Sequence, residues 1–514
     1  MINKIIKFGN KRYKKETVLS LVAMVLIVSG CSVQTQPIDF EANSVASYQR
    51  IDTIIKDEEP ITGPISLYEA MARALKYNLD EKIELLDEEF RRKQTAVTQL
   101  GMIPSITASF GVDSRNNESG SSSRSILSGQ ESLEPSSSSE KTVYSGDLIA
   151  SWDILDFGLS YVQSKQNSDE RLIAAERRRK VINRILEDVR TAYWRAVSAD
   201  RTHKKLVKLE ALTQKALLQA ETLEKRRLAP PLKVLNYQRD LLQIQSTVQR
   251  MQRELLLAKK QLAALMNLKP NSYFKLVLPD RTDVVPELPG SAQQMVMIAL
   301  QFRSELRESA YRERINIDAL QEQFISSLPG FRTVLGINYN SNEFLYNEDW
   351  INISSRISWD LTNLFRYPLQ RKALKAEAKV IQARADALTM AIMTQVHVAR
   401  ARFIRFSQEL NTIRMYNDVQ GRILTLTQNG FKAKAISQRD LVKEEMNSIL
   451  SEVRYDTAYA DLQNAYANLY ASMGVDNFDF NISPEAPVAE IAEKLRNHWE
   501  EQAVALPAVP EIPK

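Results

Sequence analysis

The stretch Leu241–Leu265, LLQIQSTVQRMQRELLLAKKQLAAL, carries apolar residues at intervals that alternate between three and four positions. This spacing is typical of the narrow seam along which one long helix packs against another. It belongs to the longer segment Ser160–Leu268, which predicts two such helices reversing direction at Leu228-Ala229-Pro230-Pro231, because proline interrupts a helix. The seam positions are Leu241, Ile244, Val248, Met251, Leu255, Ala258, Leu262 and Leu265.

The same unit occurs twice. Ser151-Trp152-Asp153 returns as Ser358-Trp359-Asp360, 207 residues later (358 − 151 = 207). Upstream, Ile103-Pro104 matches Leu328-Pro329 at an offset of 225 (328 − 103 = 225). The offsets differ by 18 (225 − 207), and the extra residues fall around the Ser-rich segment Ser114–Thr142, which we expect to be a flexible cover. Self-similarity at a fixed offset indicates an internal structural repeat.

Before each long helix the apolar residues begin to alternate with polar ones. Each alternating segment has about the length of a tilted transmembrane strand, roughly 9–11 residues. The aromatic residues near the strand ends fit a membrane interface. Four strands cannot close a membrane barrel, and open sheet edges cannot face lipid, so several copies would have to pool their strands. The alternative is a soluble hairpin packed on the helices. The four segments are 106–113, Val143–Asp153, Phe331–Asn340 and Trp350–Asp360.

The expected helix lengths define the plan of each repeat. Two shorter helices together match one long helix in length, so we expect each long helix to lie beside a coaxial pair. The first repeat has Ser160–Arg227 beside Ser66–Gln99 and Pro231–Leu268, and the second has Leu369–Asn429 beside Ser291–Ser327 and Ile436–Met473.

The N-terminus predicts export and lipidation. Six Lys/Arg precede the apolar stretch Val18–Val28, as in a secretory signal. Val28-Ser29-Gly30-Cys31 resembles a bacterial lipobox, in which the cysteine is acylated and becomes the mature N-terminus. Cys31 is the only cysteine of the chain; the alternative is a buried cysteine after an ordinary anchor helix.

These patterns divide the chain into six segments. Residues 1–30 are the lipoprotein signal peptide, 31–65 an extended tether, 66–268 the first repeat, 269–290 a Pro-rich linker and 291–475 the second repeat. We expect residues 476–514 to form an equatorial or disordered tail.

Composition excludes several classes of protein. The formal charge of the 514 residues is +5, and the first 30 residues alone hold six Lys/Arg against one Glu. The net charge of the remaining residues is therefore near zero and does not predict nucleic-acid binding. Three scattered histidines and one cysteine do not predict a metal site. No phosphate loop, nucleophile elbow or HExxH motif occurs, so we expect neither an enzyme nor a cofactor.

Together, the lipobox, the duplication, the hairpins and the paired long helices over about Ile65–Val475 resemble the TolC family of outer-membrane efflux and secretion channels, lipoprotein branch. The resemblance implies a mostly α fold with membrane β structure. A homotrimer would form a 12-stranded β-barrel in the outer membrane, continued by a 12-helix α-barrel across the periplasm. It also implies a periplasmic adaptor and an inner-membrane transporter that drives cargo through a passive conduit.

In this family, each helix turn at the periplasmic entrance usually carries a glycine and then acidic residues. Here Lys434 stands at the glycine position, Asp440 at the first acidic position and Lys443 at the second, while Lys233 matches Asp440 in the first repeat. With Arg439, these residues predict a basic entrance that tolerates anionic cargo. The alternative is that the charges face solvent or the adaptor.

Two other classes of function stay open. A periplasmic adaptor would also be a lipoprotein with a helical hairpin, but it should contain one hairpin inserted in β domains. A structural coiled-coil lipoprotein would lack alternating strands and would conduct nothing. The sequence names neither the cargo, nor the transporter class, nor the gating mechanism.

Overall fold

The computed structural model describes residues 37–507 except 57, 133, 228–229, 270–271, 282–285, 289, 476–485 and 505. The chain divides into two units, Met1–Glu58 and Glu59–Lys514. In the first unit, α2 (Phe40–Lys56) is a helix of 17 residues where an extended tether was expected. Phe40–Lys56 contains neither glycine nor proline, so no residue in it opposes a helix.

The second unit is built on two long helices, α5 (Ile154–Lys225) and α9 (Asn363–Lys432). Their 72 and 70 residues span about 108 and 105 Å at 1.5 Å per residue. Both helices start six residues earlier than predicted, because each begins at or just after the repeated Ser-Trp-Asp motif: α5 follows Asp153 directly, and α9 begins three residues after Asp360. Asp153 Oδ1 accepts a hydrogen bond from the Leu155 N–H at 2.9 Å and caps α5.

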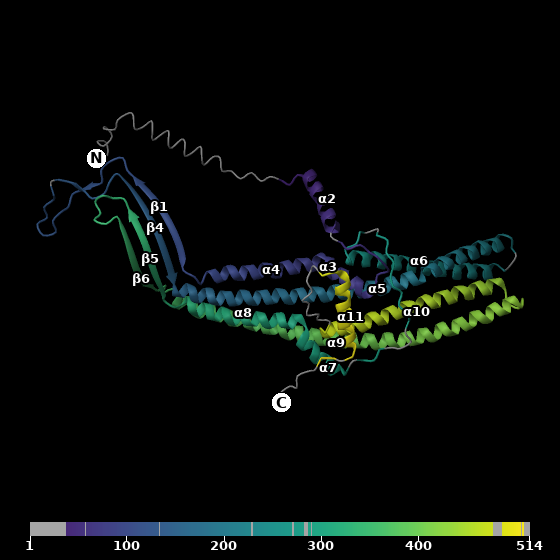
Figure 1. Cartoon of the computed structure of the whole chain (residues 1–514). Coiled ribbons are helices and arrows are strands. Elements are labelled where there is room, and N and C mark those ends of the chain that lie inside the picture. The colour runs from purple at the N-terminus through teal and green to yellow at the C-terminus, as the bar shows by residue number, and fades with distance from the viewer. Residues whose placement is uncertain are drawn as a thin grey trace, which may run out of the picture. The chain divides into compact units, whose positions relative to one another are not determined.

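Each long helix lies beside two shorter helices, as expected (Figure 1). α4 (Leu79–Leu100) follows the first half of α5 and α6 (Pro231–Leu265) follows the second half. Along α9, α8 (Ser304–Ser326) and α10 (Gln438–Met473) take the same two places. Polar contacts fix this order: Arg178–Glu81 and Arg184–Asp80 at 2.8 Å, Lys259–Asp200 at 2.8 Å, Asn363–Ser326 at 3.1 Å and Gln420–Glu444 at 2.7 Å.

The two helices expected to precede the hairpins are each broken in two, which corrects the prediction. α3 (Leu67–Tyr77) ends at Asn78 and α7 (Ala292–Phe302) ends at Arg303, 225 residues apart (303 − 78). Both residues have extended backbone, with φ/ψ of −68°/128° and −67°/127°. The Asn78 side chain caps α4 by accepting from the Asp80 N–H at 2.9 Å, so a local side-chain bond replaces the helical one.

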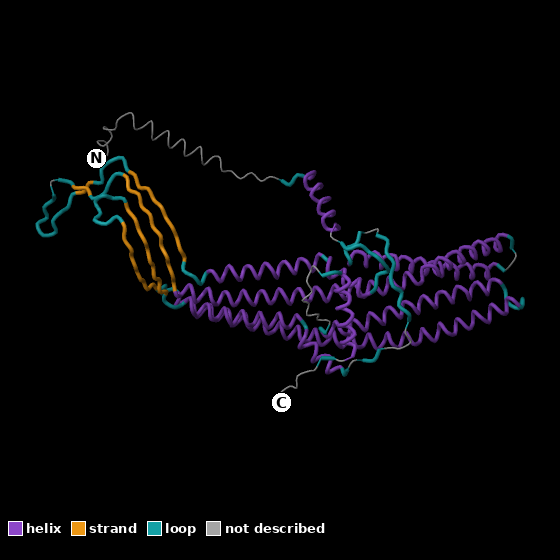
Figure 2. The backbone as a smooth tube through the Cα atoms, viewed as in Figure 1, coloured by secondary structure: helices purple, strands orange, loops and turns teal. Residues whose placement is uncertain are grey.

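The strands form one antiparallel sheet in the order β1-β4-β5-β6. Each hairpin contributes two neighbouring strands, and β4 pairs with β5 across the repeats. Within the Ser-rich segment, β2 (Gly120–Ser121) and β3 (Ser136–Ser137) make a short separate ladder. Figure 2 shows the sheet continuing from one end of the helices. The bounds of the main strands are β1 Ser105–Ser114, β4 Thr142–Asp153, β5 Gly330–Asn340 and β6 Asp349–Ser358.

The helices are tied together at their middle. The backbone of Ile65 pairs in parallel with Leu276 of the inter-repeat linker, and the Tyr193 hydroxyl of α5 donates to the Val277 carbonyl at 2.9 Å. Burial raises the pKa of Tyr193, so it stays a hydrogen-bond donor. α11 (Val488–Val504) packs on α3 around the buried Leu495. This belt of linker and C-terminal residues holds the layer of long helices in register.

Candidate functional site

The register of the sheet collects apolar side chains on one face. Residues directly opposite each other across all four strands form rows such as Ile106, Ala150, Leu335 and Ile353. None of the described helices covers this face: its large apolar side chains are exposed, and Ile353 is 74% exposed. The exposed members are Ile106, Phe110, Val112, Tyr144, Leu148, Trp152, Leu335, Ile337, Tyr339, Ile351, Ile353 and Ile357. Such a face suits a hydrocarbon environment and does not fit a soluble hairpin packed on the helices.

The opposite face of the same sheet is mainly polar. Ser109 Oγ bonds the Asp147 carboxylate at 3.2 Å, and the Asn338 amide donates to Asn352 at 2.6 Å. At the helix end of the sheet, Arg332 and Asp153 form an ion pair at 3.5 Å. Alternation along each strand thus becomes one mainly apolar and one mainly polar face once the strands are paired.

Both lateral edges of this protomer lack partners in the described structure. In the sheet, β1 pairs with β4 and β6 with β5, which leaves the outer edges of β1 and β6 open. In the helical layer, the outer helices expose apolar residues at heptad spacing. These residues are Ile83, Leu86, Phe90, Val97 and Leu100 on α4, Leu232, Leu235, Leu242 and Leu256 on α6, and Tyr416, Val419, Ile423 and Leu426 on α9. Such seams need partner helices, so the protomer is incomplete at both edges.

The two helix turns at the far end, which we call the tips, share one backbone conformation. Arg227 in the α5–α6 turn has φ 53°, and Lys434 in the α9–α10 turn has φ 57°. The two residues are 207 apart (434 − 227), so the duplication reaches into the turns. A left-handed conformation favours glycine and costs other residues about 1 kcal/mol. Sequence reasoning noted Lys434 at a glycine position but missed Arg227, which the offset of 207 would have located.

The structure places the remaining predicted entrance residues on the first turn of α6 and the first two turns of α10. Lys233 and Lys443 are exposed and have no ion pair among the described residues. Asp440 caps its own helix: its N–H donates to Ser437 Oγ at 3.2 Å, and that hydroxyl donates to the Asp440 carboxylate at 2.7 Å. Asp440 therefore has a local structural role, and α6, which starts at Pro231, has no such cap.

A contact between a guanidinium and an aromatic ring joins the two tips. The Arg439 guanidinium of α10 lies over the ring of Tyr237 in α6, 5.8 Å from its centroid, and also faces Asp440 at 3.5 Å. Burial raises the pKa of Tyr237, and the charge of Arg439 opposes that rise. Arg439 thus sits between the repeats and holds the tips together.

The tips carry a concentrated positive charge. Lys225–Asn236 and Lys432–Lys443 together contain eight Lys/Arg and one Asp, a net charge of +7 (8 − 1). Within the described structure, only Arg439 among these eight cations has an ion pair. A cluster of unneutralised cations at one end of the helices attracts anions.

Further along α5 and α10 from the two turns, a buried ion cluster joins the two repeats. The Asp456 side chain of α10 is fully buried and contacts Arg201 of α5 at 2.9 Å and Arg281 of the linker at 2.8 Å. Lys205 and Glu452 form a second α5–α10 pair. The linker therefore fastens the first repeat to the second.

Other predicted features find no site among the described residues. Cys31 and the signal segment lie outside them. In the part of the chain that the structure describes, no three His, Cys, Asp or Glu side chains gather as metal ligands. None of the described helices is both long and apolar enough to cross a membrane.

The fold matches that of known channels. No family model and no curated protein matches the sequence. Among solved structures, the outer-membrane channel OprN superimposes with a TM-score of 0.62 at 15% identity, over 79% of this chain and 89% of that one. The CmeC outer membrane channel of Campylobacter jejuni gives 0.61 at 12% identity, over 84% and 89%, and the outer membrane protein VceC of Vibrio cholerae gives 0.59 at 13% identity, over 79% and 96%. The chain therefore has the fold of the TolC-family outer-membrane channels, mostly helical with a membrane-type antiparallel sheet.

Proposed function

We propose that three copies of this chain form a passive channel through the outer membrane and across the periplasm. One observation carries the proposal: the four-stranded sheet has an exposed apolar face and a polar face, and its β1 and β6 edges are open. Pairing β1 of one copy with β6 of the next satisfies the edge backbone groups, which lipid cannot do. Three copies would supply twelve strands, enough for a membrane barrel with a lumen.

The helical edges support the same assembly. The exposed apolar seams of α4 and α6 lie on one side of the protomer and the seam of α9 lies on the other. Head-to-tail packing of these seams repeats around a ring and closes it. Each copy contributes four helices at any height, α4, α5, α8 and α9 near the sheet and α6, α5, α10 and α9 near the tips, so a trimer would enclose a tube of twelve.

The N-terminal sequence supports attachment to the same membrane. Acylation of Cys31 after signal cleavage would anchor the chain in the outer membrane, since each buried CH₂ contributes about 0.8 kcal/mol. A Cys31→Ser variant tests this: it should lose acyl incorporation from labelled palmitate while still trimerising through the sheet and helices.

The cationic tips are proposed as the periplasmic entrance, where a periplasmic adaptor and an inner-membrane transporter deliver cargo. Lys233, Lys434, Arg439 and Lys443 would ring the opening, and Asp440 would brace α10 through its hydrogen bonds with Ser437. A basic ring concentrates anions near the mouth of a pore, which favours anionic cargo.

Conductance in planar bilayers tests the channel. Purified full-length protein should run at the mass of three chains and give discrete current steps. A trimer that gives no steps at any voltage would favour a periplasmic scaffold or adaptor role and would refute the channel.

Ion selectivity tests the entrance. In a KCl gradient, the reversal potential of the unmodified channel should indicate a preference for chloride. The double variant Lys233→Glu, Lys434→Glu should shift it towards potassium. Lys260→Glu, an exposed lysine on the same α6 helix but 29 residues beyond Pro231, should leave it unchanged. Equal shifts of the reversal potential in both variants would show that the tips do not form the entrance.

A further inference from the structure

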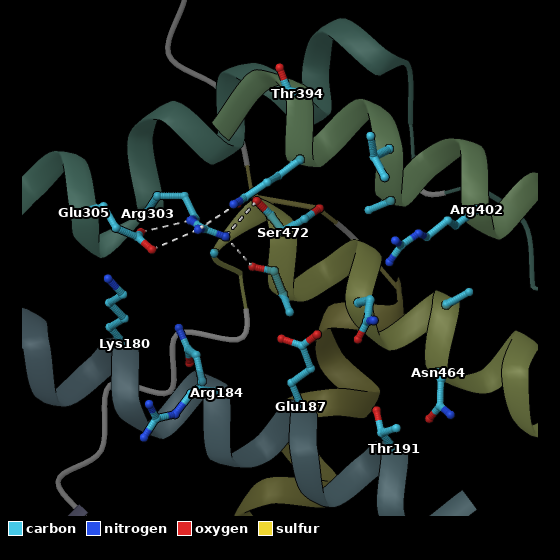
Figure 3. Close-up of a pocket in the computed structure, with 18 of the residues that line it drawn as sticks. Lys180, Arg184, Glu187, Thr191, Arg303, Glu305, Thr394, Arg402, Asn464 and Ser472 are labelled. Atoms are coloured by element: carbon cyan, nitrogen blue, oxygen red, sulfur yellow. Dashed lines mark hydrogen bonds and ion pairs between the residues drawn. The ribbon is translucent and has the colours of Figure 1, made fainter. Parts of the chain in front are cut away.

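A cavity of about 730 Å³ lies where α10 ends and α8 begins, between α5 and α9 (Figure 3). On α10 it is lined by Asp461, Asn464 and Asn468, whereas Tyr466 and Tyr470 of the same helix contact Trp499 of α11. At 100° per residue these two sets lie on opposite sides of α10. The cavity is therefore on the face of the layer away from α11, and its volume falls in the range of small-molecule sites.

The N-terminus of α8 forms one wall and lacks a side-chain cap. Its first N–H groups have no acceptor within the helix and carry partial positive charge. The hydroxyl of Ser304, on the first turn, belongs to a residue that is 6% exposed, and it has no hydrogen-bond partner in the described structure. On the α10 wall, the side-chain oxygen of Asn464, a residue 8% exposed, is likewise unpartnered among the described residues. Buried polar atoms are usually satisfied, so both atoms point to a ligand.

The guanidinium of Arg303 already makes its hydrogen bonds within the protein. Its guanidinium donates two hydrogen bonds to the Glu305 carboxylate, at 2.9 and 3.0 Å, and one to Gln395 at 3.0 Å. It also donates to the last carbonyls of α10, on Ala471 and Ser472, at 3.4 and 3.5 Å. It thus joins α8 to α10 and frames the cavity, and its charge is balanced by Glu305.

Two other cations of the lining, Arg402 and Lys180, are not balanced in this way, whereas Arg184 pairs with Asp80. The lining contains five Lys/Arg and three Asp/Glu, a net charge of +2 (5 − 3). Figure 3 shows Arg402 on α9 and Lys180 on α5 at opposite sides, and neither has an ion pair among the described residues. Glu187 also points into the cavity but has a partner within the chain. Apolar contacts come from Val398, Ala399, Phe406 and Ala465.

We propose that this cavity binds a small organic anion that has an apolar body and a hydrogen-bond donor remote from its charge. The anionic group accepts hydrogen bonds from Ser304 and the first N–H groups of α8, with Arg402 and Lys180 supplying positive charge. The remote donor bonds to the Asn464 side-chain oxygen. Binding does not depend on conduction, so this inference stands or falls separately from the proposed channel.

Two matched dyes test the site on purified full-length protein, with micelle blanks subtracted. The dye 6-(p-toluidino)naphthalene-2-sulfonate has a sulfonate and an aromatic body, with one N–H donor at the opposite end of the naphthalene. N-(p-tolyl)-2-naphthylamine has the same body and N–H without the charge. We expect one saturable site per chain for the sulfonate, with affinity at least about tenfold higher than for the neutral dye, as charge-assisted hydrogen bonds provide.

Variants assign the binding to the cavity. Ser304→Ala and Arg402→Gln should each weaken sulfonate binding about five- to tenfold and change neutral-dye binding less than about twofold. Ser304→Ala removes an unpartnered hydroxyl and should not lower thermal stability, so it remains informative if Arg402→Gln misfolds. Arg405→Gln is the matched control, because Arg405 bonds Gln408 on the same helix and does not line the cavity. Equal affinity for the two dyes, or sulfonate binding unchanged in Ser304→Ala and Arg402→Gln, overturns the proposal.

Discussion

A lysine placed at Ile353 tests the separation of the sheet into a lipid face and a polar face. Ile353 lies at the middle of β6, opposite Leu335, and Ile351 is its neighbour on the same face. It is four residues from Asp349 and five from Ser358, about 14–17 Å from either strand end at 3.4 Å per residue. A lysine there cannot carry its ammonium to the membrane surface, and Asp349, the acidic residue of β6 on that face, is too far along the strand to pair with it.

The expected cost follows from this position. Lysine on the lipid face of a membrane barrel costs about 2–4 kcal/mol at the bilayer midplane, which lowers the folding equilibrium about 30- to 1,000-fold per chain. The same substitution at the next residue, Ser354→Lys, faces the polar side and should cost less than about 1 kcal/mol. Ile353→Lys should therefore be depleted from the outer-membrane fraction of cells, and it should unfold at lower urea concentration in lipid vesicles.

The adjacent pair makes the result decisive. Both variants add the same charge to the same strand, so translation, export and net charge are matched. If Ile353→Lys assembled normally while Ser354→Lys failed, the two faces would be assigned the wrong way round. If both variants behaved alike, the sheet would not separate lipid from lumen, and the barrel would be refuted.

Three further predictions concern the helices. Asp456→Asn should lower the free energy of unfolding by about 3 kcal/mol, because it leaves the partly buried Arg201 without its counter-ion and leaves Arg281 only its longer pair with Glu452, at 3.7 Å; a melting temperature within 1 °C of the unmodified protein would contradict this. Lys434→Gly should raise stability by up to about 1 kcal/mol, since glycine adopts the left-handed backbone without strain, and a loss of stability would show that the lysine side chain contributes there. The hydrogen bond from Lys76 lowers the pKa of Glu59 below its ordinary value of 4.5, and Glu59 also accepts from the Val488 N–H at the start of α11. A lowered carboxyl pKa stabilises the fold above the unfolded pKa and loses that contribution as pH falls through the folded value. The protection factors of the α11 amides, which correct for the intrinsic pH dependence of exchange, should therefore fall below about pH 4.5, and Lys76→Gln should reduce the difference; protection factors that do not change with pH would disprove the link.

Much of the architecture is determined by the sequence alone. The three-four spacing of Leu241–Leu265 and the duplication at an offset of 207 specify two long paired helices per repeat. Alternation in segments such as Val143–Asp153 specifies the strands, and the Ser-Trp-Asp motif marks the joint between strand and helix. These features are local, because a side chain's tendency to be buried on one face of a helix or strand appears directly as a period in the sequence.

The breaks and turns were only partly predictable. Asn78 followed by Asp80 is a helix-start signal that interrupts the expected helix, yet Arg303 breaks the second repeat without one. There, bonds to Glu305, Gln395 and the end of α10 hold the extended backbone. A break stabilised by residues from three different segments cannot be derived from the residues around it.

Only the tertiary structure decided how the pieces combine into surfaces. Pairing of β4 with β5 brings Ala150 beside Leu335 and turns four separate alternating strands into one apolar and one polar face. The cavity lined by Ser304 and Asn464 arises likewise, because α5, α8, α9 and α10 meet where two helix ends leave space between them. Contacts between residues so distant in sequence depend on register and packing among whole elements, and no local pattern of side chains encodes that geometry.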